Sequence, residues 1–223
     1  MSTEKAAVFY DVDGTLVHTN ILHVYVYYAL RLPKISDKAR KLLLMMLFSP
    51  LYLLMEQMSH VLFSKLFYKN YKGIPEERLR ILGRELVRDG LMPNVYKDAL
   101  DRIKQAKKMK LTQVIVSGSL DFVMQPFAKE IGIDHVIANS LEMKAGVATG
   151  ALIPPVLPGK ERLKLMKDFA ARENIDLSKS YVFADSKFDL EMMEAVGYPV
   201  AVNPDNKLKK IAEQRGWPVV SFA

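Results

Sequence analysis

Two carboxylates, Asp11 and Asp13, stand two residues apart immediately after a short apolar run at residues 6–10. The run is rich in β-forming residues and contains no turn signal, so it predicts a buried strand. On an extended backbone both carboxylates point to the same side, and like charges this close persist best when they share a cation or have separated pKa values. Gly14 lets the backbone turn and offer an N–H to an anion, and Thr15 adds a hydroxyl. The string therefore suits metal binding or acid–base chemistry.

The same string has two simpler interpretations. Asp and Gly are turn residues, so residues 11–14 could form a surface turn, although that does not explain why they directly end an apolar strand. A calcium-binding loop would need Asp or Asn at its fifth position, Gly at its sixth and Glu at its twelfth. Those positions hold Thr15, Leu16 and Leu22, which excludes the loop. The other polar residues of the chain are needed to distinguish a surface turn from a functional site.

Further polar residues follow other predicted strands. Ser117 ends an apolar run at residues 113–116, and Asp185 ends another apolar run. Lys160 begins the helix before the second of these strands, and Asp189 lies one helical turn beyond Asp185. Because the carboxyl ends of parallel strands lie at one edge of a sheet, we expect these groups to meet there. Carboxylates, a hydroxyl and a lysine supply what phosphoryl transfer needs, namely metal ligands, a nucleophile and donors for phosphate oxygens.

The elements that must position these groups alternate between strands and helices. From Leu91 onward, strand and helix patterns follow one another, which predicts an α/β fold with a Rossmann-like parallel sheet and helices on both faces. Residues 141–152 interrupt this alternation with a predicted β-hairpin. Residues 20–89 show no strand-like alternation and predict an inserted α-helical domain. We therefore expect a core domain of residues 1–19 and 90–223, and a helical domain of residues 20–89.

Composition excludes several classes of protein. The 223 residues are 50% hydrophobic and 26% charged, which is typical of a globular chain. There is no cysteine, so disulfides and thiolate metal sites are excluded, and the four histidines show no metal-ligand spacing. Residues 2–5 lack a basic stretch leading into an apolar one. We therefore expect no signal peptide and a cytoplasmic location.

The net charge of +7 is concentrated in one segment, because residues 31–72 contain eight basic and two acidic residues. A local excess of this kind favours an anionic interface or substrate over nucleic acid. The same segment includes fourteen consecutive uncharged residues at 42–55, which is too short for a membrane-spanning helix and contains Pro50. Two interpretations stay open for this run: buried core of the helical domain, or an apolar surface that contacts the inner face of the membrane or covers a lipid chain.

The motifs taken together resemble the haloacid dehalogenase superfamily. The order and spacing of residues 11–15, Ser117, Lys160 and the pair Asp185 and Asp189 match its four motifs. The helical insertion resembles the cap domain of the phosphoserine phosphatase-like branch. Three positions depart from phosphoserine phosphatases, which puts phosphoserine as the substrate in doubt. They are Asn20 where a Glu is usual, Ser119 where a Gly is usual, and Phe188 where an Asn is usual.

The resemblance implies a role for each carboxylate. Asp11 would be the nucleophile that forms an aspartyl-phosphate, and Asp13 the general acid and base. Mg²⁺ would be held by the Asp11 carboxylate, the Asp13 backbone carbonyl and Asp185, a set of oxygen ligands that suits a hard cation. Asp189 would orient a metal-bound water or Lys160, and we count it with the metal site.

The resemblance also implies a phosphate-binding set. Ser117 and Lys160 would hold the phosphoryl oxygens, and Lys160 would thereby assist catalysis. Backbone N–H groups near Gly14 and Gly118 would add further donors, beside the hydroxyl of Thr15.

These roles favour a Mg²⁺-dependent phosphomonoesterase acting on a small phosphorylated metabolite or a lipid headgroup, including a lysophospholipid-type substrate. Within the superfamily, Asp13 argues against a hydrolytic dehalogenase, which lacks the second Asp of the first motif. Two alternative functions remain open. One is a phosphotransferase that passes the phosphoryl group to an alcohol, and the other is a membrane- or partner-binding module without catalysis.

Overall fold

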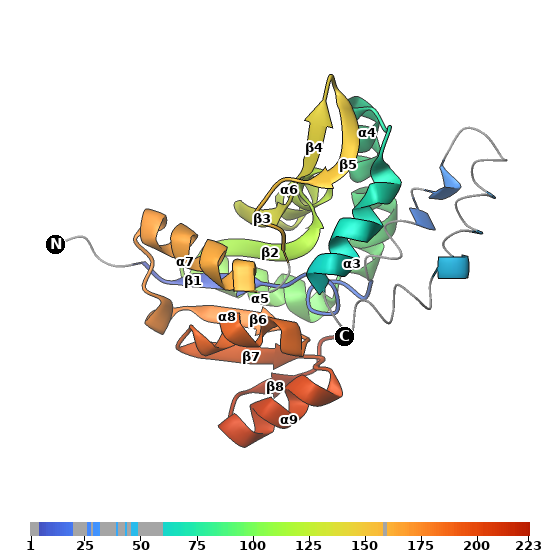
Figure 1. Cartoon of the computed structure of the whole chain (residues 1–223). Helices are drawn as coiled ribbons and strands as arrows, with labels where there is room; N and C mark the ends of the chain where they lie inside the picture. Colours follow the sequence, from blue (N-terminus) through green and yellow to red (C-terminus); the bar gives the residue numbers. More distant parts are fainter. Residues whose placement is uncertain are drawn as a thin grey trace.

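The computed structural model describes residues 5–19, 26–27, 29–31, 39, 43, 46–48, 60–157 and 160–223, and for residues 60, 61 and 160 the backbone alone. Figure 1 shows a sheet with helices packed on it, beside a helical segment and a projecting hairpin. Asn20 and most of the apolar run at 42–55 lie outside the described residues. The described members of that run, Leu43, Met46, Leu47 and Phe48, are exposed.

The sheet has six strands in the order β3-β2-β1-β6-β7-β8, and every neighbouring pair is parallel. The strands are β1 (Ala7–Tyr10), β2 (Thr112–Leu120), β3 (His135–Asn139), β6 (Tyr181–Ala184), β7 (Tyr198–Val202) and β8 (Val219–Val220). Strand β1 lies between β2 and β6. The next strands of the chain, β2 and β3, lie on one side of β1, and the later strands β6, β7 and β8 lie on the other. This arrangement creates a switch point at the carboxyl end of β1, where open α/β sheets bind ligands.

Two apolar clusters cover the two faces of the sheet. Val8 and Tyr10 pack into one cluster and Ala7 and Phe9 into the other, as the two-residue period of a strand requires. The helices that follow the strands are α5 (Lys97–Lys108), α6 (Asp121–Ile131), α7 (Lys160–Glu173), α8 (Leu190–Glu194) and α9 (Asn206–Arg215), with short 3₁₀ turns η4 (Leu177–Lys179) and η5 (Lys187–Asp189). The parallel sheet with helices on both faces confirms the predicted fold class.

A third cluster joins the helical segment to the β-hairpin. The segment contains α3 (His60–Phe67), η1 (Tyr68–Tyr71), α4 (Glu76–Leu86), η2 (Val87–Leu91) and η3 (Met92–Asn94), and the antiparallel hairpin consists of β4 (Leu141–Lys144) and β5 (Val147–Leu152). Phe67 and Tyr71 are buried in the same cluster as Leu141 and Leu152. The division at residues 20–89 stays a prediction, and in the described part no helix is long and apolar enough to cross a membrane.

Strand β2 differs from its prediction. It was expected to end at Ser117, but it continues through Gly118 to Leu120. The pairing with β3 shifts its register between Ser117 and Leu120. An irregularity of this kind lets a strand continue while it bends and re-aims its side chains. The polar residues Ser117 and Ser119 thus lie within a bent strand end and not in a turn.

Candidate active site

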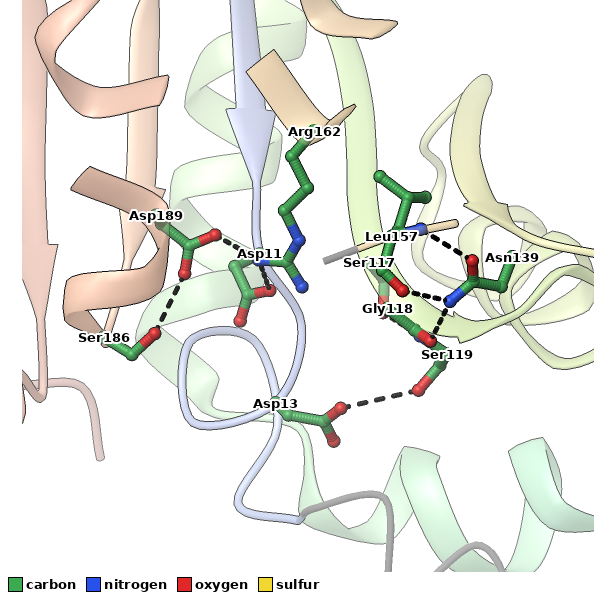
Figure 2. A network of polar contacts seen from close by, with 10 residues as sticks. All are labelled: Asp11, Asp13, Ser117, Gly118, Ser119, Asn139, Leu157, Arg162, Ser186 and Asp189. Carbon is green, nitrogen blue, oxygen red and sulfur yellow. Dashed lines mark hydrogen bonds and ion pairs between the residues drawn. The ribbon is translucent and has the colours of Figure 1, made fainter. Parts of the chain in front are cut away.

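The carboxyl ends of three adjacent strands bring together most of the predicted site residues. Asp11 follows β1 and Asp185 follows β6, while Ser117 lies in the bent end of β2. The backbone N–H of Asp11 donates to the carbonyl of Phe183 at 3.0 Å, which extends the pairing of β1 and β6 to the site. Figure 2 shows Asp11 beside Asp189 and Arg162, with Asp13 on the neighbouring loop.

Three carboxylates form an acidic cluster at this edge. Each of Asp11, Asp185 and Asp189 has a carboxylate oxygen within 4.8 Å of one from each of the others. Asp11 and Asp189 are buried, and Asp185 is half-buried. Asp189 is fixed by the Ser186 hydroxyl, which donates to its carboxylate at 3.1 Å. Like charges packed this closely in a low-dielectric site need a cation or bound protons.

Arg162 supplies a cation to this cluster and was not predicted from the sequence. Its guanidinium Nη1 contacts Asp11 Oδ1 at 3.2 Å and also pairs with Asp189. Arg162 lies on the same face of α7 as the buried Met166 and Phe169, four and seven residues later. A charged residue in the apolar stripe of a helix indicates a buried partner, and this signal could have identified it.

The cluster remains electrostatically strained because one guanidinium faces several carboxylates. Burial, followed by the charge of Asp189, raises the pKa of Asp11 well above its ordinary value, although Arg162 opposes this. Burial and then Asp189 raise the pKa of Asp185 to about 7. Burial disfavours the charged form of Arg162, but Asp189 and Asp11 outweigh it and keep its pKa above the usual value. Negative charge is therefore in excess, as expected for a site that receives a metal ion.

Gly14 allows the loop after β1 to approach this cluster. Its φ is +80°, a conformation that residues with a side chain rarely adopt. A Cβ atom at this position would lie 2.3 Å from Asp185 Oδ2. Any other residue would therefore both strain the loop and displace a carboxylate of the acidic cluster.

Asp13 lies apart from the acidic cluster and faces the bent end of β2 (Figure 2). The Ser119 hydroxyl is 3.5 Å from Asp13 Oδ2, and the Ser119 N–H donates to Ser117 Oγ at 3.1 Å. Ser117 accepts this bond, so its own O–H proton can point elsewhere. The hydroxyl of Thr15 is buried and has no hydrogen-bond partner among the described residues. The Ser119 hydroxyl thus lies near the Asp13 carboxylate, and the Thr15 hydroxyl is left without a described partner.

Asn139 connects the bent strand to the segment that leads into α7, and sequence reasoning did not identify it. Its side-chain amide donates to the carbonyls of Gly118 and Leu157 at 2.6 and 2.7 Å. Its carbonyl oxygen accepts from the N–H of Leu157 at 2.9 Å. One side chain, only 1% exposed, therefore fixes two backbone segments of the site against each other.

Replacing Asn139 with aspartate is expected to destabilise the protein by about 2 kcal/mol or more, because a carboxylate would face two buried carbonyls with no proton to donate. Urea unfolding would measure the loss. Asn206→Asp, on the exposed first turn of α9, is the matched control and should be neutral or slightly stabilising. Equal effects of the two changes would show that Asn139 does not hold the site together.

Comparison with known proteins identifies the family. The family model described as haloacid dehalogenase-like hydrolase matches residues 8–194, which include all four candidate motifs. The chain belongs to this family. The chain is also 34% identical over 146 residues to a probable phosphatase of Mycobacterium tuberculosis, and 32% identical over 152 residues to a Streptomyces azureus protein named for inhibition of morphological differentiation. These matches cover 66% and 68% of this chain and 50% and 54% of the relatives, so the chain spans about half the length of these curated relatives.

Solved structures of haloacid dehalogenase-like and related proteins share the fold. A Bordetella pertussis protein of unknown function aligns with a TM-score of 0.84 at 22% identity, covering 98% of this chain and 99% of that one. A phosphoserine phosphatase in its apo form aligns with a TM-score of 0.69 at 18% identity, covering 98% of this chain and 94% of that one. These likenesses confirm the fold predicted from the resemblance to the phosphoserine phosphatase-like branch.

Lys160, the lysine predicted for the third motif of the family, is the first residue of α7. Its side chain lies outside the described residues, so its predicted role stays a prediction. The structure instead describes Arg162, two residues later on the same helix, as a partner of Asp11 and Asp189.

The donor set at the acidic cluster fits the Mg²⁺ that the family implies. Three carboxylates with excess negative charge offer oxygen ligands, which this hard cation prefers. Asp11, Asp185 and Asp189 would hold the ion. The Asp13 carboxylate is not part of the cluster, and the ligand expected from Asp13 is its backbone carbonyl.

Mg²⁺ is expected to raise the melting temperature more at pH 8 than at pH 6. The ligands must be deprotonated, and with the pKa of Asp185 near 7, binding at pH 6 should be about tenfold weaker. Without metal, stability is expected to change with pH in the opposite direction. The folded state holds a proton that the unfolded state has lost between pH 3.8 and about 7, so stability falls as pH rises through that window. Melting curves with Mg²⁺ and with EDTA test both, and a pH-independent Mg²⁺ shift would contradict the site.

Proposed function

We propose that this chain is a Mg²⁺-dependent phosphomonoesterase that works through an aspartyl-phosphate on Asp11. The observation that carries the proposal is the placement of two carboxylates from one motif in different surroundings. Asp11 lies in the acidic cluster with Arg162, whereas Asp13 lies outside it near the Ser119 hydroxyl. Two carboxylates with different environments can divide nucleophilic and acid–base work between them. The mycobacterial relative is named a probable phosphatase, which supports the same reading.

In the first half-reaction, an Asp11 oxygen attacks phosphorus and the bond from phosphorus to the leaving oxygen breaks. Asp13 gives its proton to that oxygen, so the product leaves as an alcohol. Ser117, the backbone N–H groups near Gly14 and Gly118, and Lys160 hold the phosphoryl oxygens, with Thr15 beside them. When bound, Mg²⁺ offsets the negative charge of the phosphoryl group and the carboxylates.

In the second half-reaction, Asp13 takes a proton from water as that water attacks phosphorus. The bond between phosphorus and Asp11 breaks, and inorganic phosphate leaves. Throughout the cycle, Arg162 keeps Asp189 and Asp11 in position and balances part of their charge. Residues 1–19 and 90–223 would form the catalytic domain, and residues 20–89 the cap that selects a small phosphorylated substrate.

The test is release of inorganic phosphate from a panel of phosphomonoesters with Mg²⁺ and with EDTA. The panel includes an aryl phosphate, phosphoserine, glycerol phosphates and lysophosphatidate. Metal-dependent turnover of at least one compound is expected, and its absence across the panel would sink the proposal. Adding an alcohol acceptor and analysing its phosphorylated product distinguishes transfer to alcohol from hydrolysis.

A further inference from the structure

A broad, strongly basic groove is built partly from elements that also contact the candidate active site. Its volume is about 1250 Å³, and its walls come from α3 and η1, from β5 with the segment after it, and from the first turns of α7. Four lysines line the groove, whereas only one of its lining residues, Glu161, is acidic. The lysines are Lys65, Lys69, Lys72 and Lys164. All four are exposed, and none forms an ion pair with another residue that the structure describes.

The spacing of three of these lysines is electrostatically unfavourable when no anion is bound. Lys65, Lys69 and Lys72 follow one another at intervals of four and three residues, and residues 57–75 contain no Asp or Glu. Like charges at such helical spacings repel, and a concave surface of one sign concentrates its potential. A bound anion would relieve this repulsion.

The backbone that carries Lys69 and Lys72 is held firmly against β5. Gly150 has φ +82°, and a Cβ on it would lie 3.0 Å from Lys72 Cβ and 3.1 Å from Lys69 Cα. The Gly73 N–H also donates to the Ala148 carbonyl, and the Ala148 N–H to the Ile74 carbonyl, both at 2.9 Å. Because these groups are positioned in advance, an anion would not have to order the backbone of this wall.

Two elements connect the groove to the candidate active site. In η1, Tyr68 donates its hydroxyl to the Gly118 carbonyl at 2.9 Å, while the next residue, Lys69, lines the groove. In α7, Arg162 pairs with Asp11, while Lys164 lines the groove. Tyr68 and Lys69 are neighbours in η1, and Arg162 is the neighbour of Glu161, which also lines the groove. Neighbouring residues of a helix point about 100–120° apart, so each element has one side toward the site and a different side toward the groove.

We propose that this groove binds a second anionic group, a phosphate or a carboxylate, carried by the leaving group of the substrate. The inference rests on the phosphomonoesterase function proposed above and narrows its substrate class. The preferred substrate is a phosphomonoester with a distal negative charge, and the lysines recognise that charge through charge-assisted hydrogen bonds.

The experiment compares an alkanediol bisphosphate with the alkyl monophosphate of the same chain length. Wild type should prefer the bisphosphate in kcat/KM. The double variant Lys69→Gln/Lys72→Gln should lower this preference about tenfold, through KM and not kcat, because it removes charged contacts. Lys69→Arg/Lys72→Arg keeps the charges and should retain the preference.

The matched control is Lys107→Gln/Lys108→Gln, which makes the same charge change at the exposed end of α5. If the groove and control variants keep equal preferences, or if wild type shows no preference, the groove proposal is overturned. If wild type hydrolyses neither compound, the panel of phosphomonoesters described above decides whether the phosphomonoesterase proposal stands. Calorimetry then tests the groove proposal separately, by measuring the affinity of the bisphosphate for wild type and for Lys69→Gln/Lys72→Gln. Equal affinities overturn the groove proposal, and a lower affinity of the double variant supports it.

Discussion

Replacing Asp11 with asparagine is expected to lower kcat/KM for an aryl phosphate by about 10⁴-fold or more, because the amide is a poor nucleophile and a weaker metal ligand. The folded protein should nevertheless persist. Asp11 is a buried carboxylate whose pKa is raised by burial and by neighbouring carboxylates, so removing its charge relieves repulsion. Arg162 keeps its second partner, Asp189.

Two readouts separate a catalytic role from a structural one. Steady-state kinetics measure the loss of turnover, and urea unfolding in EDTA should show a stability equal to or above wild type. Asp101→Asn, an exposed carboxylate on α5, is the matched control and should leave both unchanged. An Asp11→Asn enzyme that keeps near wild-type turnover would falsify the aspartyl-phosphate mechanism.

The second large effect is expected at Arg162. Arg162→Met keeps an unbranched apolar stem but removes the charge, leaving Asp11 and Asp189 buried without this partner. Breaking a buried pair in this way costs about 3–5 kcal/mol. Urea unfolding in EDTA at pH 8 measures the loss, which should shrink at lower pH as protonation of Asp11 replaces the missing cation.

Mg²⁺ provides a second readout for Arg162. The metal should recover more stability in the variant than in wild type, because it brings positive charge to the same carboxylates. Arg172→Met is the control on the same helix, since Arg172 is 69% exposed and its contact with Glu173 is worth less than about 1 kcal/mol. If both arginine variants unfold alike, Arg162 does not balance the acidic cluster.

Much of the fold followed from local patterns in the sequence. The apolar run before Asp11 and the runs before Ser117 and Asp185 each predicted a strand, and the structure confirms all three in one parallel sheet. Parallel strands force their carboxyl ends to one edge, so the sequence alone could place Asp11 and Asp185 together. The predicted length of β2 was wrong. The strand continues beyond Ser117 through an irregular pairing with β3, and the local sequence gives no signal for such a pairing.

The candidate site was less predictable where a residue acts through tertiary contacts. Arg162 and Asn139 both have partners far along the chain, since Arg162 reaches Asp11 and Asn139 reaches Gly118. A buried polar residue can be suspected from a helix pattern, but its partner depends on how the layers pack. Most of residues 31–72 lie outside the described residues, so the hypothesis that this segment contacts a membrane stays a prediction.

The hairpin of β4 and β5 has a consequence for anyone who would exchange the helical segment between relatives. The hairpin follows β3 of the sheet in the chain, yet Leu141 and Leu152 pack with Phe67 and Tyr71, and its backbone is hydrogen-bonded to the turn before α4. A graft cut only at the ends of the helical insertion would leave part of this shared interior behind, with apolar side chains exposed on both pieces. The natural unit of exchange is therefore discontinuous, with the hairpin travelling alongside the helices as a second inserted piece.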